Sequence, residues 1–260
     1  MTISIIVLLL TFIFLLSFNI PIALAIGVST TLSMIITIPI APALTTIAQQ
    51  MATGINSFAL LAIPFFILSG YIMAQGGIAN RLINFAKVIV SSLPGGLAYV
   101  NIIACMFFGA ISGSAAAATS AVGGVMIPSM NKEGYDKNFN TALTVTASTT
   151  GLLIPPSNIL IIYSLASGGV SISALFIAGY IPGLLIGLSL IFVSMIMARI
   201  NNYPSGLGYD LKDIISRSFE ALPSLLLIYI VIGGIIKGVF TATEASVVAV
   251  LYSLLLAFLY

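Results

Sequence analysis

The stretch that decides the fold is GLLIPPSN, residues 151–158, in the middle of an apolar segment, 141–167, of membrane-spanning length. A proline inside a helix removes a backbone N–H and its ring clashes with the carbonyl four residues back. Each proline also disfavours the helical conformation of the residue before it. Gly151 is typical of a helix end, and Ser157 can cap a new helix. The segment therefore predicts two half-helices joined by an extended piece that holds both prolines.

The composition around this stretch is that of an integral membrane protein. Of the 260 residues, 60% are hydrophobic and only 5% are charged, whereas soluble domains carry about 25% charged residues. The apolar runs are continuous, and barrel strands would need apolar–polar alternation. The fold class is therefore an all-α polytopic membrane protein in a lipid bilayer. The net charge of +2 is small and gives no reason to expect a nucleic-acid partner.

The reactive side chains argue against an enzyme. The chain has one cysteine, Cys105, and no histidine, which excludes an intramolecular disulfide, a Cys–His metal site and Ser-His-Asp catalysis. A Ser-Lys protease would need a lysine at mid-depth in the membrane, but all eight basic residues fall at span ends or in loops. We expect no catalytic residue and no organic cofactor.

Several stretches can cross a membrane, which takes about 20 apolar residues. Residues 207–221, between two of them, place apolar residues on one helical face and charged residues elsewhere. This predicts a helix in the cytoplasmic interface or, alternatively, a solvated loop. A last stretch begins near residue 243 and continues to Tyr260. The other stretches are, roughly, 2–18, 20–40, 57–76, 141–167, 172–198 and 222–240.

The stretch 97–130 is too long for one span and too short for two spans with an ordinary loop. Its middle reads GAISGSAAAATS, residues 109–120. Two arms of about fifteen residues, at about 1.5 Å each, cover only part of a hydrocarbon core of about 30 Å. We predict a re-entrant hairpin with its tip at Ser112, Gly113 and Ser114. Two short tilted helices packed by small residues are the alternative.

The basic residues predict one orientation, because cytoplasmic loops carry the excess of Lys and Arg. They cluster before the predicted hairpin, after it, and in the next basic loop. With all three clusters in the cytoplasm, the hairpin enters and leaves on one side and the N-terminus lies outside. The clusters contain Arg81, Lys87, Lys132, Lys137, Arg199, Lys212 and Arg217.

The break and the tip together suggest a transport site. A broken helix frees backbone carbonyls, which are tolerated at membrane depth only where they are buried or line a cavity. Hydroxyl, amide and carbonyl oxygens without a carboxylate suit a monovalent cation such as Na⁺ better than a tightly held divalent ion. Bonding of single Ser and Thr residues to their own helix is the alternative. The candidate Na⁺ ligands are Ser112, Gly113, Ser114, Gly151, Pro155, Ser157 and Asn158.

The same place can attract an anion. The half-helix that begins near Ser157 points the positive end of its dipole into the break. An anionic substrate group is therefore expected beside the cation. The candidate substrate-binding residues are Ser114, Ser157 and Asn158.

Two segments share a weak internal similarity. FNIPIALAIGV begins at Phe18, and FTATEASVVAV begins at Phe240. Both follow an apolar span and lead into a second one, on opposite sides of the membrane under the orientation above. Opposed copies of this kind are typical of inverted-repeat transporters, although so short a similarity can also arise by chance.

Three runs also carry a family resemblance. FFILSGYIMAQGGIANRLINFAKVIVSSLPGGLAYVNI, GAISGSAAAATSAVGGVMIPSM and TGLLIPPSN resemble the large membrane subunit, DctM-like, of tripartite ATP-independent periplasmic (TRAP) transporters. LKDIISRSFEALPSLLL and GVFTATEASVVAVLYSLLL are similar to the same family. The resemblance extends from about residue 10 to the last residue.

The resemblance implies a function and a mechanism. Members of this family import organic acids such as C4-dicarboxylates and sialic acid across the bacterial inner membrane, driven by Na⁺. A periplasmic binding protein delivers the substrate, and a small membrane subunit packs against the large one. The implied fold is an elevator-type transporter in which each of two inverted repeats supplies one hairpin and one broken helix. The tip at Ser112–Ser114 and the break at Gly151–Asn158 match the family's first sodium site.

The resemblance also implies a second hairpin and a second broken helix beyond residue 260. The sequence is therefore expected to be a fragment, an early-terminated product or one part of a split gene. A non-functional fragment and a structural membrane scaffold are the alternatives to a permease subunit. The expected divisions are 1–96 (scaffold helices and an interfacial segment), 97–167 (transport-domain hairpin and broken helix), 168–221 (returning span and interfacial helix) and 222–260 (truncated start of the second repeat).

Overall fold

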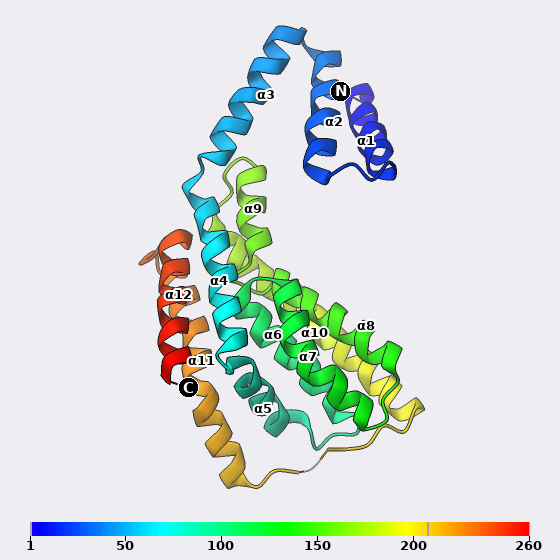
Figure 1. Cartoon of the computed structure of the whole chain (residues 1–260), viewed down its shortest axis with the longest axis vertical. Coiled ribbons are helices and arrows are strands. Elements are labelled where there is room, and N and C mark those ends of the chain that lie inside the picture. The colour runs from blue at the N-terminus through cyan, green and yellow to red at the C-terminus, as the bar shows by residue number, and fades with distance from the viewer. Residues whose placement is uncertain (1, 207, 260) are drawn as a thin grey trace. The chain divides into compact units, whose positions relative to one another are not determined.

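The computed structural model describes residues 2–206 and 208–259, which form helices and connecting turns with no β-strand among them. The chain divides into two compact units, Met1–Ser57 and Phe58–Tyr260. The helices follow one another from blue to red in Figure 1. An all-α membrane fold is thus confirmed.

The first unit holds three helices, α1 (Thr2–Ser17), α2 (Ile22–Thr37) and α3 (Ile40–Ile55). α1 and α2 pack side by side, and the turn between them uses Asn19 at a φ of 59°. The Ser33 hydroxyl donates to the Ser4 carbonyl at 2.8 Å and links the two helices. A helix over most of α3 was not predicted from the sequence. Pro42 is compatible with it, because the first turn of a helix needs no backbone N–H from that residue.

The second unit begins with a 3₁₀ turn, η1 (Phe58–Leu61), and continues into α4 (Ala62–Gln75). Among the later elements, α6 and α7 form the hairpin, and α8 and α9 form the broken segment. The elements that follow α4 are α5 (Ile78–Val90), α6 (Gly96–Ser112), α7 (Ala115–Lys132), α8 (Lys137–Ser148), the 3₁₀ turn η2 (Thr149–Leu152), α9 (Asn158–Ala166), α10 (Ile172–Ile200), α11 (Leu211–Ile236) and α12 (Ala242–Leu259).

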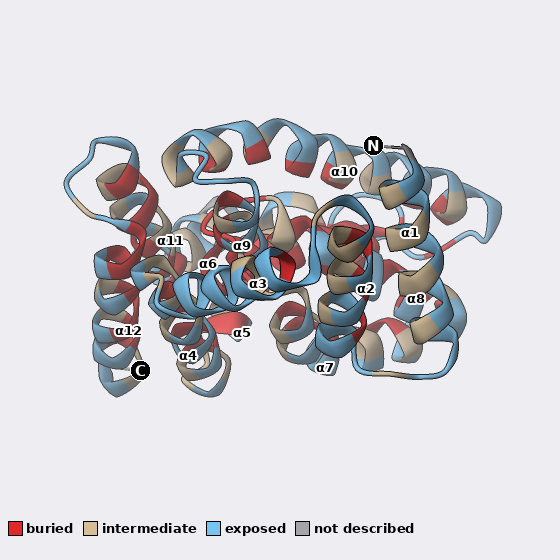
Figure 2. Ribbon diagram, turned by 90° about the horizontal axis from the view of Figure 1, so that it is seen from above, coloured by how far each residue is buried: buried red, intermediate tan, exposed pale blue. Residues whose placement is uncertain are grey.

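α6 forms the centre of the second unit. Nearly all of its residues are buried, and it packs against α4, α5, α7, α8, α10 and η2. Figure 2 shows the buried residues gathered on the inward faces and the exposed ones outside. Most of the outward-facing large side chains are hydrophobic, as expected for a surface that faces lipid rather than water. Elsewhere in the unit, α12 lies along α4, and the buried hydroxyls of Ser69 and Ser253 are 2.8 Å apart.

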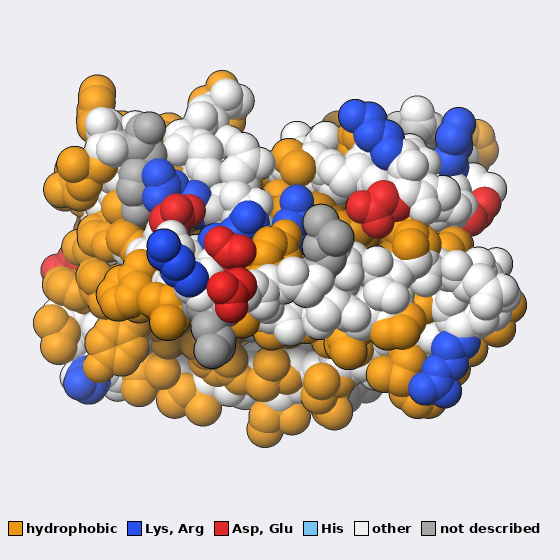
Figure 3. Space-filling view, turned by 90° about the horizontal axis from the view of Figure 1, so that it is seen from below, with side chains coloured by type: hydrophobic (Ala, Val, Ile, Leu, Met, Phe, Trp, Pro, Cys, Tyr) orange, Lys and Arg blue, Asp and Glu red, His pale blue; other side chains and the backbone are white. Residues whose placement is uncertain are grey.

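The base of the hairpin is joined to the α10–α11 connection. The Gly95 amide donates to the Pro204 carbonyl at 3.1 Å, and the Gly206 amide donates to the Ser91 carbonyl at 2.8 Å. The ring of Tyr203 stacks on that of Tyr135, with centroids 4.2 Å apart. Figure 3 views this end of the unit, where acidic and basic side chains gather and hydrophobic side chains surround them. These contacts hold the two ends of the hairpin against one polar segment.

Four helical segments in the described part of the chain are long and apolar enough to cross a membrane: Phe58–Gln75, Ile172–Ile200, Lys212–Ile236 and Ala242–Leu259. They match four of the stretches predicted from the sequence. α1 and α2 have 16 residues each, which is shorter than the typical span of about 20. The segment 141–167 is broken, as predicted.

One boundary was wrong. The sequence predicted an interfacial helix over 207–221 and a separate span over 222–240, but residues 211–236 form the single helix α11. Pro223 lies inside it and removes only one backbone N–H, which membrane helices tolerate. Residue 207, where the predicted interfacial helix begins, lies outside the described residues. The boundaries of the four predicted divisions stay predictions.

The two segments with the weak sequence similarity adopt similar local structures. Each forms the turn of a helix pair, α1–α2 in one case and α11–α12 in the other. Each turn holds a residue with positive φ, Asn19 at 59° and Gly238 at 71°. The start of α12 is further fixed by the Thr241 amide, which donates to the Glu244 carboxylate at 2.8 Å. This is the reciprocal capping arrangement that begins many helices.

Candidate functional site

The hairpin tip is a tight turn of three small residues. Gly113 ends α6 with a φ of 61°, a left-handed conformation that favours glycine. Its amide donates to the Gly109 carbonyl at 2.8 Å. Ser114 then caps α7, because its hydroxyl accepts from the Ala117 amide at 3.3 Å. The Ser112 hydroxyl is fully buried and lies 3.4 Å from the Ser114 amide and carbonyl. The tip therefore satisfies most of its own polar groups.

The break in the long segment lies where the prolines predict it. α8 ends at Ser148, the 3₁₀ turn η2 follows, and α9 begins at Asn158. Ser157 closes the break from both sides: its hydroxyl donates to the Leu152 carbonyl and accepts from the Leu160 amide at 3.4 Å. The Pro155–Pro156 peptide bond is cis. Residues 154–158 are all buried, so the extended piece lies inside the protein.

Glycines bring the tip and the break into backbone contact. A Cβ on Gly109 would lie 2.5 Å from the Cα of Gly151, and a Cβ on Gly151 would lie 2.5 Å from the Cα of Gly109. A Cβ on Gly113 would lie 2.7 Å from the Pro156 carbonyl oxygen. The Asn158 amide donates to the Gly113 carbonyl at 3.4 Å. The predicted meeting of tip and break is present in the fold, and only glycine allows it.

Four helix ends meet at this junction. α6 and η2 end there, so their last carbonyls carry partial negative charge, while α7 and α9 begin there and their first amides carry partial positive charge. The C-terminal ends suit a cation, and the N-terminal ends suit an anion. One junction thus offers complementary fields to both kinds of ligand.

Several oxygens of the break are available for coordination. The Asn158 side chain is 7% exposed, and its Oδ1 has no hydrogen-bond partner. Among the described residues, no backbone amide donates to the carbonyls of residues 153–156. A buried oxygen without a partner costs about 1–3 kcal/mol, and a ligand bound at the break would offset this cost for several oxygens at once.

Two further helices, α10 and α4, form walls of the junction. A Cβ on Gly179 of α10 would lie 2.2 Å from the Leu153 carbonyl oxygen, and one on Gly183 would lie 2.5 Å from Ile154. On the other side, a Cβ on Gly70 of α4 would lie 2.6 Å from the Ser112 Cβ. Sequence reasoning missed these glycines. Their signal is the four-residue spacing of small residues along an apolar helix, which allows close helix packing.

Three threonines near the break bond only to the preceding turn of their own segment. Thr146 and Thr149 are exposed and donate to the Ala142 and Thr146 carbonyls. Thr150 is buried and donates to the Ala147 carbonyl at 2.6 Å. For these threonines the alternative of local backbone bonding holds. Ser157 also bonds locally, but it does so across the break.

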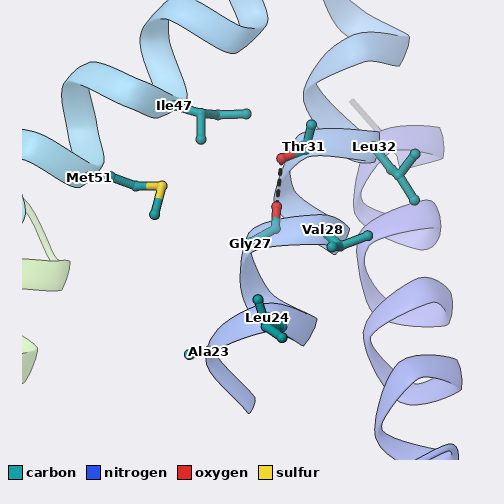
Figure 4. A pocket seen from close by; sticks show the side chains of 8 residues that line it. All are labelled: Ala23, Leu24, Gly27, Val28, Thr31, Leu32, Ile47 and Met51. Carbon is teal, nitrogen blue, oxygen red and sulfur yellow. Dashed lines mark hydrogen bonds between the residues drawn. The ribbon is translucent and has the colours of Figure 1, made fainter. Parts of the chain in front are cut away.

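A separate hollow lies in the first unit between α2 and α3. Its volume is about 310 Å³, and it is lined by Ala23, Leu24, Gly27, Val28, Thr31, Leu32, Ile47 and Met51. Thr31 is the one hydroxyl among these residues, and Figure 4 shows it donating to the Gly27 carbonyl, at 2.6 Å. The hollow is therefore apolar and offers nothing to a carboxylate or an ion.

A comparison with known families gives a match over most of the chain. The family described as "Tripartite ATP-independent periplasmic transporter, DctM component" matches residues 9–260. This chain belongs to the DctM family. It is accordingly a multi-pass membrane protein of a transporter family rather than of an enzyme family, as the sequence predicted.

Three relatives illustrate the similarity of this DctM chain. "Uncharacterized protein YgiK" of Salmonella typhimurium is 53% identical over 89% of this chain and 53% of the relative. The "C4-dicarboxylate TRAP transporter large permease protein DctM" of Vibrio cholerae is 44% identical over 81% of this chain and 47% of the relative. The "Sialic acid TRAP transporter large permease protein SiaM" of the same species is 43% identical over 80% and 49%. The chain spans about half the length of the curated relatives it matches.

Proposed function

We propose that this DctM chain supplies the first hairpin and first broken helix of a large permease subunit that imports an organic acid together with Na⁺ across the bacterial inner membrane. The observation that carries the proposal is the junction of Gly113 with Asn158. There a hairpin tip and a broken helix bring free oxygens and helix ends to one buried place. A purely structural role does not account for the grouping of these oxygens and helix ends at one place.

The cation part of the proposal rests on the type of oxygen present. The Asn158 Oδ1 and the free carbonyls of residues 153–156 are neutral donors. None of the chain's six acidic residues lies in the tip or the break, so the site carries no formal charge to hold a divalent ion. Neutral oxygens fit a monovalent cation that must bind and leave again. The predicted ligands Ser112, Ser114 and Ser157 stand around the same junction.

The substrate part rests on the two helix N-termini and on the relatives. The first amides of α7 and α9, capped by Ser114 and Ser157, attract an anionic group. The names of two relatives include C4-dicarboxylate and sialic acid, both of which carry carboxylates. We infer that a carboxylate of the substrate binds beside the cation, near Ser114, Ser157 and Asn158.

The proposal includes an elevator-type mechanism and two partner proteins. The hairpin and the broken helix move as one body against scaffold helices in an elevator-type cycle. A periplasmic binding protein delivers the substrate, and a small membrane subunit completes the transporter. The basic clusters face the cytoplasm, so the arms of the hairpin, 17 and 18 residues long, enter and leave on that side. At about 1.5 Å per residue, each arm is shorter than the membrane core of about 30 Å.

Uptake in liposomes tests the proposal. The complete two-repeat permease that contains this chain is reconstituted with its small subunit and binding protein. Uptake of a labelled dicarboxylate or sialic acid is then measured with an inward gradient of Na⁺ or of K⁺. We expect uptake only with Na⁺, and none from the 260-residue chain alone, which holds half of the site. Equal uptake with K⁺ would contradict Na⁺ coupling. Na⁺-driven uptake by the isolated chain would show that one repeat is enough.

Cysteine labelling tests the orientation. Single cysteines at residues 84, 134 and 208, in a Cys105→Ser background, are expected to resist an impermeant thiol reagent added from outside. A cysteine at residue 169 is expected to react. Labelling of residues 84 and 134 from opposite sides would contradict the re-entrant hairpin.

A further inference from the structure

Two stripes of small and polar residues face each other along α6 and α8. On α6 they recur every four residues, at Asn101, Cys105, Gly109 and Gly113. Each meets a partner on α8 or in the break: Asn101 meets Thr144, Cys105 meets Ser148, Gly109 meets Gly151, and Gly113 meets Asn158. The two segments therefore run in the same direction and in one register, which ends at the candidate site.

The first step of this register is a directed hydrogen bond between side chains. The Asn101 Nδ2 donates to the Thr144 Oγ1 at 2.7 Å, and the Thr144 hydroxyl donates its own proton to the Asn140 carbonyl at 2.7 Å. Asn101 and Thr144 are both fully buried. Since the threonine has one proton and it is already committed, the amide of Asn101 must be the donor between the two helices. This fixes the orientation of the asparagine side chain.

The second contact of this register, between Cys105 and Ser148, is weaker. The third contact, between Gly109 and Gly151, does not favour one register over another. The Ser148 hydroxyl donates to the Thr144 carbonyl at 2.8 Å and lies 3.5 Å from the Cys105 sulfur. At Gly109 and Gly151 two backbones without side chains are in close contact. Such a contact permits close approach but does not by itself prevent sliding along the helix axis. A single buried polar pair, in contrast, can define the register of packed helices.

We propose that Asn101 and Thr144 are positioning residues for the ion site, and that their hydrogen bond sets the register of the hairpin arm against the broken helix. A slip by one residue moves the tip by about 1.5 Å and separates Gly113 from Asn158. It also leaves a buried amide without a partner. Neither residue is among the proposed ligands: Asn101 lies 12 residues before Gly113, and Thr144 lies 14 residues before Asn158. The proposal rests on the proposed function, because the consequence of the register is Na⁺ binding.

The test uses the complete permease in detergent and measures two quantities for each variant. One is the melting temperature without Na⁺. The other is the Na⁺ concentration that gives half of the Na⁺-induced rise in melting temperature, a readout that needs no transport. The variants are Asn101→Leu, Thr144→Val, the double variant, and Thr144→Ser, which keeps the hydroxyl. Asn201→Ala is the matched control, because Asn201 is an exposed asparagine whose amide donates to its own helix at Met197.

Each single apolar variant is expected to lower the melting temperature and to raise the half-saturating Na⁺ concentration. Loss of one buried hydrogen bond corresponds to about a threefold to tenfold change in affinity. Thr144→Ser and Asn201→Ala are expected to bind Na⁺ like the wild type. The double variant is the decisive one. With both polar partners gone, stability can return, but the register is no longer specified, so Na⁺ affinity stays low.

Two results would overturn the inference. The first is a double variant that recovers both stability and Na⁺ affinity, since packing alone would then set the register. The second is unchanged Na⁺ affinity in both single variants. A wild-type protein whose melting temperature does not respond to Na⁺ at all would instead contradict the proposed function. The failure of one claim is thus distinguishable from the failure of the other.

Discussion

The hairpin tip and the helix break are both interruptions of apolar helices, but they treat their polar groups differently. The tip is short, and its serines bond within it: Ser114 accepts from Ala117, and Ser112 lies within 3.4 Å of the Ser114 backbone. The break leaves the Asn158 Oδ1 without a partner and the carbonyls of residues 153–156 without an amide donor among the described residues. Both lie in the same buried junction.

This difference separates two roles. The tip allows the backbones of the hairpin and the break to come close together, because residues 109 and 113 are glycines without a Cβ. The break supplies free oxygens, because its prolines prevent the carbonyls from being used in a helix. We therefore expect substitutions that change the distance between the hairpin and the break to affect the whole site. Substitutions of single oxygens should affect Na⁺ affinity, more strongly at the break than at the tip.

The largest effect is expected from Gly151→Ala. The added Cβ would lie 2.5 Å from the Gly109 Cα, and two backbones must separate to admit it. Overpacking of this kind costs about 1–3 kcal/mol of stability, and a displacement of about 1 Å can reduce activity about a hundredfold. Uptake in liposomes and the melting temperature measure both effects. The control is Gly124→Ala in α7, where nothing lies within 4 Å. Equal uptake by the two variants would refute the role of close approach.

The next effect is expected from the double substitution Pro155→Ala with Pro156→Ala. Alanines restore two backbone N–H groups and favour helix, so the break can close and reclaim its carbonyls. We expect the half-maximal Na⁺ concentration for uptake to rise by up to about a hundredfold, the upper end of the range for the loss of a single ligand. Pro182→Ala, in the interior of α10, is the matched proline control. An unchanged Na⁺ dependence would mean that the prolines form only a packing kink.

A smaller effect is expected from Asn158→Ala, which removes the unpartnered oxygen but keeps the backbone amide that bonds Gly113. Loss of one ligand of about 1–3 kcal/mol corresponds to roughly a tenfold to hundredfold loss of Na⁺ affinity. The amount of protein in the membrane should hardly change, because the oxygen takes part in no bond that holds the fold. Half-maximal Na⁺ concentrations from uptake curves measure the effect, and a wild-type curve would exclude Asn158 as a ligand.

The smallest effect is expected from Ser114→Ala. This hydroxyl is half-buried and already accepts from the Ala117 amide, so part of its capacity is used as a helix cap. We expect about a threefold to tenfold rise in the half-maximal Na⁺ concentration and a loss of stability of about 1 kcal/mol from the missing cap. Ser189→Ala, an exposed serine that bonds its own helix, is the control. A larger effect on Na⁺ at Ser114 than at Asn158 would reverse the comparison between tip and break.

The sequence predicted the elements of the site because each depends on local rules. Pro155 and Pro156 cannot continue a helix, and Ser157 is a good cap, so the break is a property of a few consecutive residues. The tip at residues 112–114 follows from arm lengths and small residues in the same way. The single helix α11 was not predicted, because amphipathic pattern and apolar run suggest two elements, and a local pattern does not show that the backbone continues through Pro223.

The sequence by itself determined that the chain is a helical membrane protein, where its long segment breaks, and which neutral oxygens stand near the break. Only the tertiary structure decided which of them are free: Thr150 bonds its own turn, whereas Asn158 keeps an oxygen without a partner. It also decided that Gly109 meets Gly151 and Asn101 meets Thr144, 42 and 43 residues away along the chain. The physical reason is that propensity acts between neighbours, whereas register and coordination depend on distances between helices that no local pattern encodes.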